Sequence, residues 1–234
     1  MIGVVIPAHN EEQLIGACLD AVMLAARHPA LRGEAVEVWV VLDDCADDTG
    51  AIVSRHGAQA LAVDLRNVGA ARAFGASRVL SNGARWLAFT DADSRVAQDW
   101  LVRQIELDAD VVCGTVAVED WSPHRERALQ LQHHYRATYN DADGHAHVHG
   151  ANLGVSAAAY QRAGGFAALA TSEDVALVEA LRASGARIAW SAAPRVVTSA
   201  RRVARAPLGF AAALCSAADA LFVASDVHEL CRGT

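Results

Sequence analysis

Short apolar runs alternate with amphipathic helical patterns through the first hundred residues of this chain. The run Ile2–Ile6 has the character of a buried strand, and apolar residues then recur at helical spacing from Leu14 to Met23. The same alternation predicts strands at 36–42, 60–63 and 86–90, and helices at 51–56, 68–80 and about 100–105. Because strand–helix–strand units join parallel strands by right-handed crossovers, the pattern predicts an α/β fold with a mainly parallel, Rossmann-like sheet and helices on both faces.

The second half of the chain is less regular, and it predicts a mixed region. The patterns there indicate strands at 110–118 and 152–156, helices at 125–139 and 175–182, and short β-runs near Ile188 and Val196. There is no internal repeat and no linker rich in Pro or Ser. We therefore expect a single compact domain over residues 1–234.

The composition fits one large globular domain. Of the 234 residues, 53% are hydrophobic and 20% are charged, which excludes extensive disorder and a coiled coil. The net charge of −7 argues against a protein whose main role is to bind nucleic acid through its phosphates. All 20 basic residues are Arg; a guanidinium suits diphosphate binding, although compositional bias is the simpler explanation.

Cysteine usage and the N-terminus favour a cytoplasmic protein. The odd, scattered set of cysteines has no CxxC pair and is typical of reduced thiols. Met1 leads directly into an apolar strand, without the basic region of a signal peptide. The apolar stretch 208–224 is too short and too interrupted to span a bilayer, although it suits a helix lying on a surface. We therefore expect no transmembrane segment.

Acidic residues follow three of the predicted strands. They occur in the segments 7–12, 43–48 and 91–93. Because the carboxyl ends of parallel strands meet at one edge of the sheet, these carboxylates would repel one another unless a cation or a ligand compensates them. Their convergence predicts a divalent-metal or nucleotide site.

A DxD pattern alone is weak, because the chain contains three. The pairs are Asp91/Asp93, Asp108/Asp110 and Asp141/Asp143. Only Asp91/Asp93 follows a strand immediately, whereas the second pair precedes a strand and the third leads into a glycine loop. An Asx-type turn that caps the next helix is the alternative interpretation of Asp91/Asp93.

Six motifs in order carry a family resemblance. VVIPAHNEE, VVLDDCADDT, NVGAARAFGA, FTDADS, HGANLGVS and SEDVAL extend from about residue 4 to the region of residue 205 and together resemble the family-2 glycosyltransferases of GT-A fold. The resemblance implies a nucleotide-sugar-binding half at 1–95 and an acceptor and catalytic half at 96–234. It also implies an enzyme that moves a sugar from a nucleotide-diphosphate sugar to an acceptor hydroxyl, on a small molecule or a lipid-linked acceptor.

The resemblance assigns the donor side residue by residue. Asp44 matches the carboxylate that binds the base or ribose, with a turn residue as the alternative. Arg72 matches a basic side chain near the diphosphate, which a guanidinium can bind bidentately. Asp91 and Asp93 match the metal motif for Mg²⁺ or Mn²⁺, hard cations that carboxylates and phosphates hold. The nucleoside loop corresponds to Pro7, Ala8, Asn10 and Glu11.

On the acceptor side, the resemblance assigns the pair Glu173–Asp174. Asp174 matches the general base that takes the proton from the acceptor hydroxyl, which implies inversion at the anomeric carbon, and Glu173 is the second choice. The alternative is that two acids simply complement a helix N-terminus. His149 and Asn152 match the acceptor and sugar pocket.

Other polar clusters stay open. His145, His147 and His149 alternate, so three imidazoles on one strand face would suit zinc, while a structural loop is the alternative. A late basic cluster would either close over the diphosphate or form a solvated turn; it comprises Arg201, Arg202 and Arg205.

Two departures from the family pattern qualify the assignment. Cys45 stands where the family usually has Gly, so the backbone there must tolerate a side chain. No QxxRW segment is present, which favours transfer of a single sugar over polymer synthesis. Two other functions remain as alternatives, a non-catalytic nucleotide-sugar-binding module and a sugar nucleotidyltransferase. The second would require a Gly-rich basic loop after the first strand.

Overall fold

The computed structural model describes residues 1–203 and 209–232, and side chains as far as residue 221. The chain forms two compact units, one of residues 1–117 and 141–198 and one of residues 118–140 and 199–234. The division of one domain into two halves at residue 95 stays a prediction. The second unit, which two separate segments build, has an apolar core of its own. That core contains Trp121, Leu131, Ala200, Leu214 and Ala218.

The first unit is built on a seven-stranded sheet in the order β3-β2-β1-β4-β7-β6-β8. The strands are β1 (Ile2–Ala8), β2 (Val36–Asp43), β3 (Gln59–Val63), β4 (Trp86–Phe89), β6 (Val111–Gly114), β7 (Leu153–Ser156) and β8 (Ile188–Ser191). β1, β2, β3 and β4 are parallel, as the alternation predicts, and so are β6 and β8. A small second sheet pairs β5 (Arg95–Val96) with β9 (Val196–Val197).

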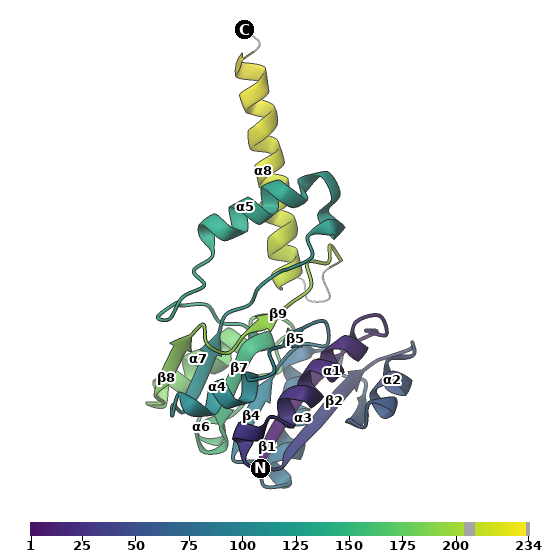
Figure 1. Cartoon of the computed structure of the whole chain (residues 1–234), viewed down its shortest axis with the longest axis vertical. Coiled ribbons are helices and arrows are strands. Elements are labelled where there is room, and N and C mark those ends of the chain that lie inside the picture. Colours follow the sequence, from purple (N-terminus) through teal and green to yellow (C-terminus); the bar gives the residue numbers. More distant parts are fainter. Residues whose placement is uncertain (204–208, 233–234) are drawn as a thin grey trace. The chain divides into compact units, whose positions relative to one another are not determined.

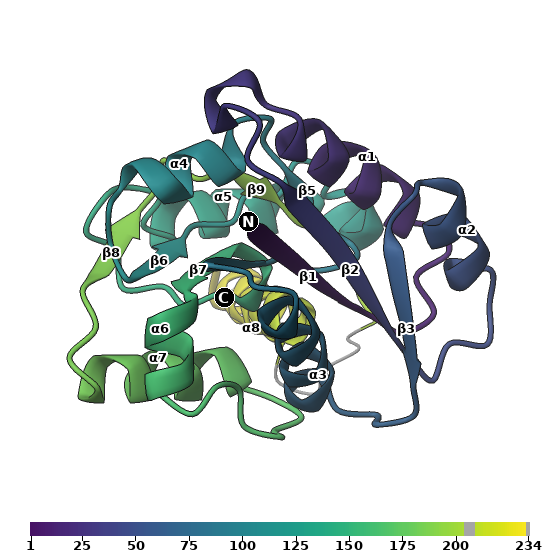
Figure 2. The same ribbon diagram turned by 90° about the horizontal axis from the view of Figure 1, so that it is seen from below.

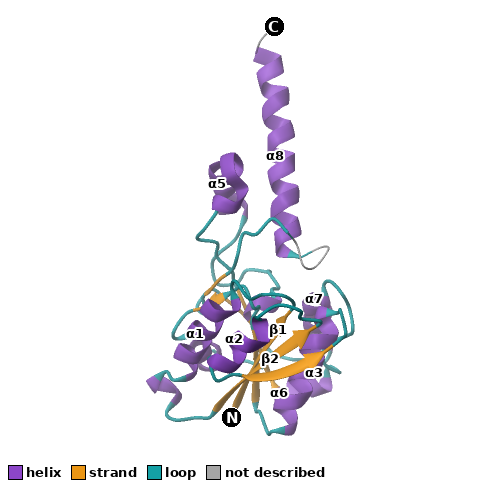
Figure 3. Cartoon of the chain, turned by 90° about the vertical axis from the view of Figure 1, so that its right-hand side faces the viewer, coloured by secondary structure: helices purple, strands orange, loops and turns teal. Residues whose placement is uncertain are grey.

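Helices cover both faces of the sheet (Figures 2 and 3). On one face lie α1 (Ile15–Ala26), α2 (Thr49–Arg55) and α4 (Trp100–Glu106), which pack into a core with β1 and β2. On the other lie α3 (Val68–Ser81), α6 (Ala157–Arg162) and α7 (Glu173–Ala183). The mainly parallel sheet with two helical layers confirms the predicted α/β class.

Glycines let α3 lie close to the central strand. An added Cβ on Gly75 would come within 2.5 Å of Val5 Cγ1, and one on Gly3 within 2.5 Å of Val79 Cβ. The small residues therefore allow the helix backbone to approach β1 directly. This close packing fixes the start of α3 beside the carboxyl ends of the strands.

β7 runs antiparallel to both of its neighbours, β4 and β6. Its amino end therefore lies at the edge of the sheet where the parallel strands β1, β2, β4 and β6 have their carboxyl ends. The segment before β7 contains the short helical turn Gly150–Asn152. Reversal of this one strand thus brings the HGAN motif to the edge that carries the acidic loops.

In the second unit, α5 (Ala128–Thr138) and α8 (Phe210–Arg232) are the main elements (Figure 1). Trp121 lies against Tyr135, which stacks on Tyr139 with ring centroids 4.7 Å apart. Asp219 forms an ion pair with Arg127 at 2.5 Å. Among the described residues, no helix is both long and apolar enough to cross a membrane.

Several boundaries differ from those expected. The strand predicted to reach residue 118 ends at Gly114, because its partner β8 ends opposite it at Ser191, and the carbonyl of Thr115 accepts from the side chain of Asn152 instead. The helix predicted at 125–139 begins at Ala128, because Arg125 has a left-handed φ of 52°. The patterns missed α6 and β5, which are too short to show a period, whereas the β-run predicted near Val196 corresponds to β9.

Candidate active site

Hydrogen bonds join the loops after β1 and β2 into one surface. The backbone N–H of Glu11 donates to Thr49 Oγ1 at 2.9 Å, and that of Glu12 to Asp47 Oδ2 at 3.1 Å. In return, the N–H of Asp48 donates to Glu12 Oε2 at 3.1 Å. The acidic residues of this region therefore act partly as acceptors for each other's backbone, which offsets their mutual repulsion.

The predicted nucleoside loop is held from the β2 side. Pro7 and Ala8 end β1, and the amide oxygen of Asn10, a residue with φ of 53°, accepts from the N–H of Ala46 at 2.8 Å. The thiol of Cys45 donates to the carbonyl of Ala8 at 3.3 Å.

The residue with a left-handed φ in the loop after β2 is Asp44, with φ of 53°. Cys45 itself has no left-handed φ, so the side chain in place of the family's glycine brings no backbone strain.

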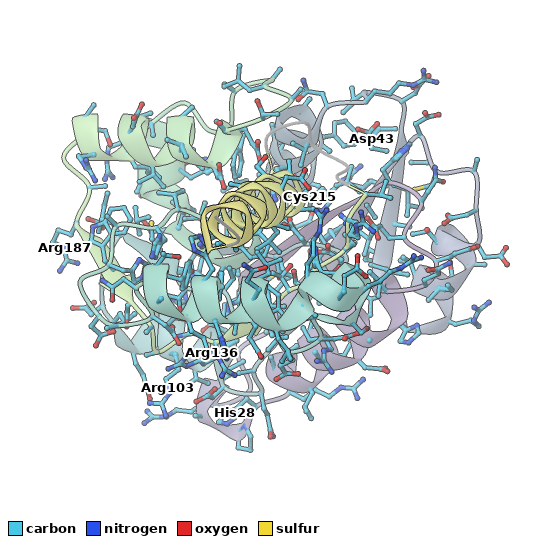
Figure 4. All side chains as sticks on the ribbon, turned by 90° about the horizontal axis from the view of Figure 1, so that it is seen from above. His28, Asp43, Arg103, Arg136, Arg187 and Cys215 are labelled. Carbon is cyan, nitrogen blue, oxygen red and sulfur yellow. The ribbon has the colours of Figure 1, made fainter. Side chains whose placement is uncertain are left out.

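Asp43 and Asp44 are adjacent but have different environments. Asp43 (Figure 4) is buried and accepts backbone N–H groups from Leu65, Arg66 and Asn67 at 2.6, 2.9 and 3.0 Å. It therefore anchors the segment that leads into α3. Asp44 is more exposed and pairs with Nε of Arg66 at 2.9 Å. Of the two, Asp44 is the carboxylate that a ligand can reach.

Asp91 and Asp93 follow β4, as predicted. Asp91 is 37% exposed, and its Oδ1 accepts from Nη2 of Arg72. Oδ1 of Asp93 accepts from the hydroxyl of Ser94 at 3.2 Å, and the hydroxyl oxygens of Ser94 and Thr198 are within hydrogen-bond distance at 2.9 Å. Thr198 directly follows β9, so the small β5–β9 sheet places it beside the DxD segment.

Arg72 lies in the interior, 3% exposed, between two carboxylates. Nη2 donates to Asp91, and Nη1 donates to Oε1 of Glu173. Although burial acts to lower it, the charges of Asp91 and Glu173 hold the pKa of Arg72 above its ordinary value. The guanidinium predicted to lie near a diphosphate thus has both Nη atoms bound to protein carboxylates.

The pair Glu173–Asp174 begins α7, as predicted, and its two members differ. Glu173 is buried, and burial raises its pKa although Arg72 acts in the opposite direction. Asp174 is partly exposed, and its Oδ2 accepts the backbone N–H of Gly150 at 2.7 Å. The two carboxylates therefore have separate partners: a buried cation for Glu173 and a backbone donor for Asp174.

Asn152 lies beneath the candidate site as a support. Its side chain is fully buried, with Oδ1 accepting from Nε1 of Trp100 at 2.9 Å. Nδ2 donates to the carbonyls of Thr115 and Pro194 at 2.7 and 2.8 Å. The amide predicted to line the sugar pocket is thus bound to three surrounding segments of the protein.

The three alternating histidines stack face to face. Ring centroids of His145 and His147 are 5.5 Å apart with planes at 19°, and those of His147 and His149 are 5.9 Å apart with planes at 26°. Nearly parallel rings at this spacing do not direct their nitrogens to one ion at about 2.0–2.1 Å, so the geometry does not support the zinc interpretation. Burial lowers the pKa of His149 to about 4, so its imidazole is neutral at pH 7.

The other two DxD pairs have structural partners. Asp110 accepts the N–H of Arg187 at 2.9 Å, and Asp141 pairs with Arg195 at 2.6 Å. Asp143 accepts from the Ser191 hydroxyl and the N–H of Ala192, both at 2.8 Å. These carboxylates connect loops to β8 and its surroundings, which agrees with their exclusion from the predicted site.

A scan with a family model of glycosyl transferase family 2 matches residues 3–163. This range contains the acidic loops, the DxD segment and the histidines. The chain belongs to glycosyl transferase family 2. No curated protein sequence matches it significantly.

Solved structures share the fold of this family 2 chain at low sequence identity. TarS of S. aureus, in complex with UDP-GlcNAc, has a TM-score of 0.62 and 16% identity, over 89% of this chain and 61% of that one. The mannosyltransferase PcManGT of Pyrobaculum calidifontis, with GDP-Man and Mn²⁺, has a TM-score of 0.59 and 20% identity, over 86% and 57%. Glucosyl-3-phosphoglycerate synthase of Mycobacterium tuberculosis, with Mn²⁺, UDP and glucosyl-3-phosphoglycerate, has a TM-score of 0.59 and 18% identity, over 96% and 79%.

These likenesses show that the family 2 chain has the GT-A fold, as predicted. The chain covers less than two thirds of the TarS and PcManGT chains. Among the described residues, no group of three or more His, Cys, Asp or Glu side chains is arranged to hold a metal ion. A hard cation held by two carboxylates, phosphates and water does not need such a group, and the oxygen donors of Asp91 and Asp93 fit it.

Sequence reasoning missed some residues of this edge and left others open. Arg66, the partner of Asp44, precedes the NVGAAR motif and gave no pattern of its own. Thr198 reaches Asp93 only through the β5–β9 pairing, which no periodicity indicates. Arg201 and Arg202 belong to the second unit, and Arg205 lies outside the described residues.

Proposed function

We propose that this chain transfers a single sugar from a nucleotide-diphosphate sugar to an acceptor hydroxyl, with a divalent metal ion and with inversion. The observation that carries this proposal is the arrangement of carboxylates at one edge of the sheet. Asp44 and Asp91 follow parallel strands, and Asp174 is tied to the antiparallel strand beside them through Gly150. Family membership and the nucleotide sugars or nucleotides bound by the structural neighbours support it.

The nucleoside would lie against the joined loops after β1 and β2. Asp44 accepts a hydrogen bond from the base or ribose, and the segment from Pro7 to Glu11 contributes backbone atoms. The hydrogen bonds between the loops support this role, because a surface fixed before binding loses little entropy when the nucleoside arrives.

Asp91 and Asp93 would hold Mg²⁺ or Mn²⁺. When bound, the ion neutralises charge on the diphosphate as it leaves. The partial exposure of Asp91 and the Mn²⁺ bound in two of the similar structures support the assignment. Ser94 and Thr198 position Asp93 for this contact through their hydroxyls.

Asp174 would take the proton from the acceptor hydroxyl. Its accessible position and its hydrogen bond to Gly150 support this choice over Glu173, whose carboxylate is buried and bound to Arg72. The neutral imidazole of His149 lies next in sequence to Gly150 and would line the acceptor side. Direct displacement with the help of this base inverts the anomeric centre.

A donor panel tests the proposed function. UDP-, GDP-, ADP-, CDP- and TDP-sugars are screened by thermal shift with and without Mn²⁺, since a ligand at 100-fold over its Kd adds about 2.7 kcal/mol of stability. The donor that stabilises most is then incubated with hydroxyl acceptors, and the product is followed by proton NMR. We expect a glycoside of inverted configuration. Binding without transfer to an acceptor or to water would instead indicate a non-catalytic module.

A further inference from the structure

One buried cation connects the donor side of the site to the acceptor side. The guanidinium of Arg72 gives one nitrogen to Asp91, which follows β4, and the other to Glu173, which begins α7. Arg72 and Glu173 are 3% and 5% exposed, so water screens their attraction poorly. These two carboxylates therefore share a single positive charge.

The surroundings leave the guanidinium little room to move. The N–H of Gly69, one turn before Arg72 in α3, donates to the carbonyl of Leu169 at 3.1 Å, which ties α3 to the segment before α7. An added Cβ on Gly150 would come within 2.5 Å of Nη2 of Arg72, so the backbone there lies against the guanidinium. Phe166 lies against it as well, with its ring centroid 5.8 Å from Cζ. When the charge of one carboxylate changes, Arg72 therefore stays in place, and the relative strength of its ion pairs with Asp91 and Glu173 changes.

We propose that Glu173 is a positioning residue that sets the affinity of Asp91 for its divalent cation, and that it acts through Arg72. The inference rests on the proposed function, in which Asp91 holds the metal ion. Arg72 and the metal ion are both cations, and they compete for the carboxylate of Asp91. A stronger ion pair between Arg72 and Asp91 therefore lowers the affinity of Asp91 for the metal ion.

The sign of the effect follows from this competition. Glu173 takes part of the electrostatic attraction of the guanidinium, which weakens the ion pair between Arg72 and Asp91 without a movement of Arg72. When the charge of Glu173 is removed, Asp91 becomes the main ionic partner of Arg72, and a metal ion must compete with a stronger ion pair. Linkage is reciprocal, so metal bound at Asp91 strengthens the pair between Arg72 and Glu173 by the same factor. Binding of the donor with its metal ion would thereby stabilise the start of α7, where Asp174 lies.

A matched pair of variants tests this coupling by metal binding. Glu173→Gln and Glu179→Gln make the same change on the same helix, but Glu179 is exposed. The Kd of Mn²⁺ is measured by electron paramagnetic resonance on each full-length variant, in the presence of the nucleoside diphosphate that stabilises the wild-type protein most. We expect Glu173→Gln to weaken Mn²⁺ binding about fivefold or more, and Glu179→Gln to leave it within twofold. Equal affinities in the two variants overturn the inference.

Two further variants guard the test against a folding defect. Glu173→Asp keeps the charge but withdraws the carboxylate by one methylene, so we expect the same direction of change with a smaller size. In an Arg72→Met background the route between the two sides is missing, and adding Glu173→Gln is expected to change the Kd of Mn²⁺ by less than twofold. A full fivefold effect in that background would show that Glu173 acts without Arg72.

The failure of this inference differs from the failure of the proposed function. If the wild-type protein binds the nucleotide equally well in Mn²⁺ and in EDTA, the proposed metal use is contradicted and the inference falls with it. If the wild-type protein requires Mn²⁺ but Glu173→Gln behaves like Glu179→Gln, the proposed function stands and only the coupling is overturned.

Discussion

Gly150 donates its backbone N–H to Oδ2 of Asp174 over 2.7 Å. The other oxygen, Oδ1, accepts the N–H of Val175 at 2.8 Å, at the first turn of α7. Both donors are backbone groups of regular or tightly packed segments, so they fix the plane of the carboxylate. A carboxylate held in this way is oriented before an acceptor arrives, which is what a general base requires.

Asp93→Ala should abolish the Mn²⁺-dependent part of nucleoside diphosphate binding and leave the fold intact. The carboxylate is proposed to bind the metal ion directly, and the hydroxyls of Ser94 and Thr198 are among its protein partners. Thermal shift with UDP and GDP in Mn²⁺ and in EDTA measures the effect. An unchanged Mn²⁺-dependent shift would remove Asp93 from the metal site.

The other DxD pairs supply controls for that experiment. Asp110→Ala and Asp143→Ala should lower stability, because both carboxylates accept backbone N–H groups. Neither should change the difference in nucleotide affinity between Mn²⁺ and EDTA. A change in that difference would mean that more than one DxD pair contributes to metal binding.

Substitutions at Asp43 and Asp44 should have different effects, one on stability and the other on nucleotide binding. Asp44→Ala should weaken nucleoside diphosphate binding by about 1–3 kcal/mol, the usual cost of an unmatched polar group, with or without metal. Isothermal titration calorimetry in Mn²⁺ and in EDTA measures this loss. If it occurs only with Mn²⁺, Asp44 belongs to the cation site instead.

Asp43→Ala should act on the fold. Three backbone N–H groups lose their acceptor, so we expect a destabilisation of about 3 kcal/mol in urea unfolding. Asp44→Asn is the control and should cost less than about 1 kcal/mol, because that side chain is partly exposed and Asn tolerates the left-handed φ of 53°. Equal losses in the two variants would contradict the anchoring role of Asp43.

The stability that Asp143 contributes should depend on pH. Hydrogen bonds from Ser191 and Ala192 hold the pKa of Asp143 below its ordinary value of 3.8. A lowered folded-state pKa means that the contribution is present above pH 3.8 and is lost as the pH falls through the folded-state pKa. The difference in unfolding free energy between wild type and Asp143→Asn should therefore shrink below pH 3.8. A constant difference from pH 7 to pH 2.5 would assign it to shape alone.

The positions of the acidic loops could be predicted because β1, β2 and β4 form strong strand patterns with short helices between them. Parallel connections then place Asp44, Asp91 and Asp93 at one edge without any knowledge of contacts. Only the family motif, and no strand or helix pattern, indicates a role for Asp174 at this edge. No local pattern indicates that β7 runs antiparallel, and it is this reversal that brings Gly150 to Asp174.

Burial could not be predicted in the same way. Arg72 and Asn152 are polar residues in motifs, and polar residues are expected at the surface. Their burial depends on partners far away in sequence, such as Glu173 for Arg72 and Pro194 for Asn152. The separate apolar core of α5 and α8 gave no local signal either, because residues 141–198 lie between the two segments that build it.

The rate of sugar transfer by Asp174→Asn tests the central claim most directly. Asn keeps the shape and one acceptor oxygen, which can take the N–H of Gly150, and it does not accept a proton at neutral pH. Its NH2 group cannot accept the N–H of Val175. We predict that the transfer rate falls by roughly 10²–10⁴, while the Kd of the nucleoside diphosphate with Mn²⁺ stays within about twofold. Glu173→Gln is the control, and we expect a smaller loss of transfer from it. Transfer by Asp174→Asn at nearly the wild-type rate, with Glu173→Gln inactive or with both variants active, would contradict the assignment of Asp174 as the base.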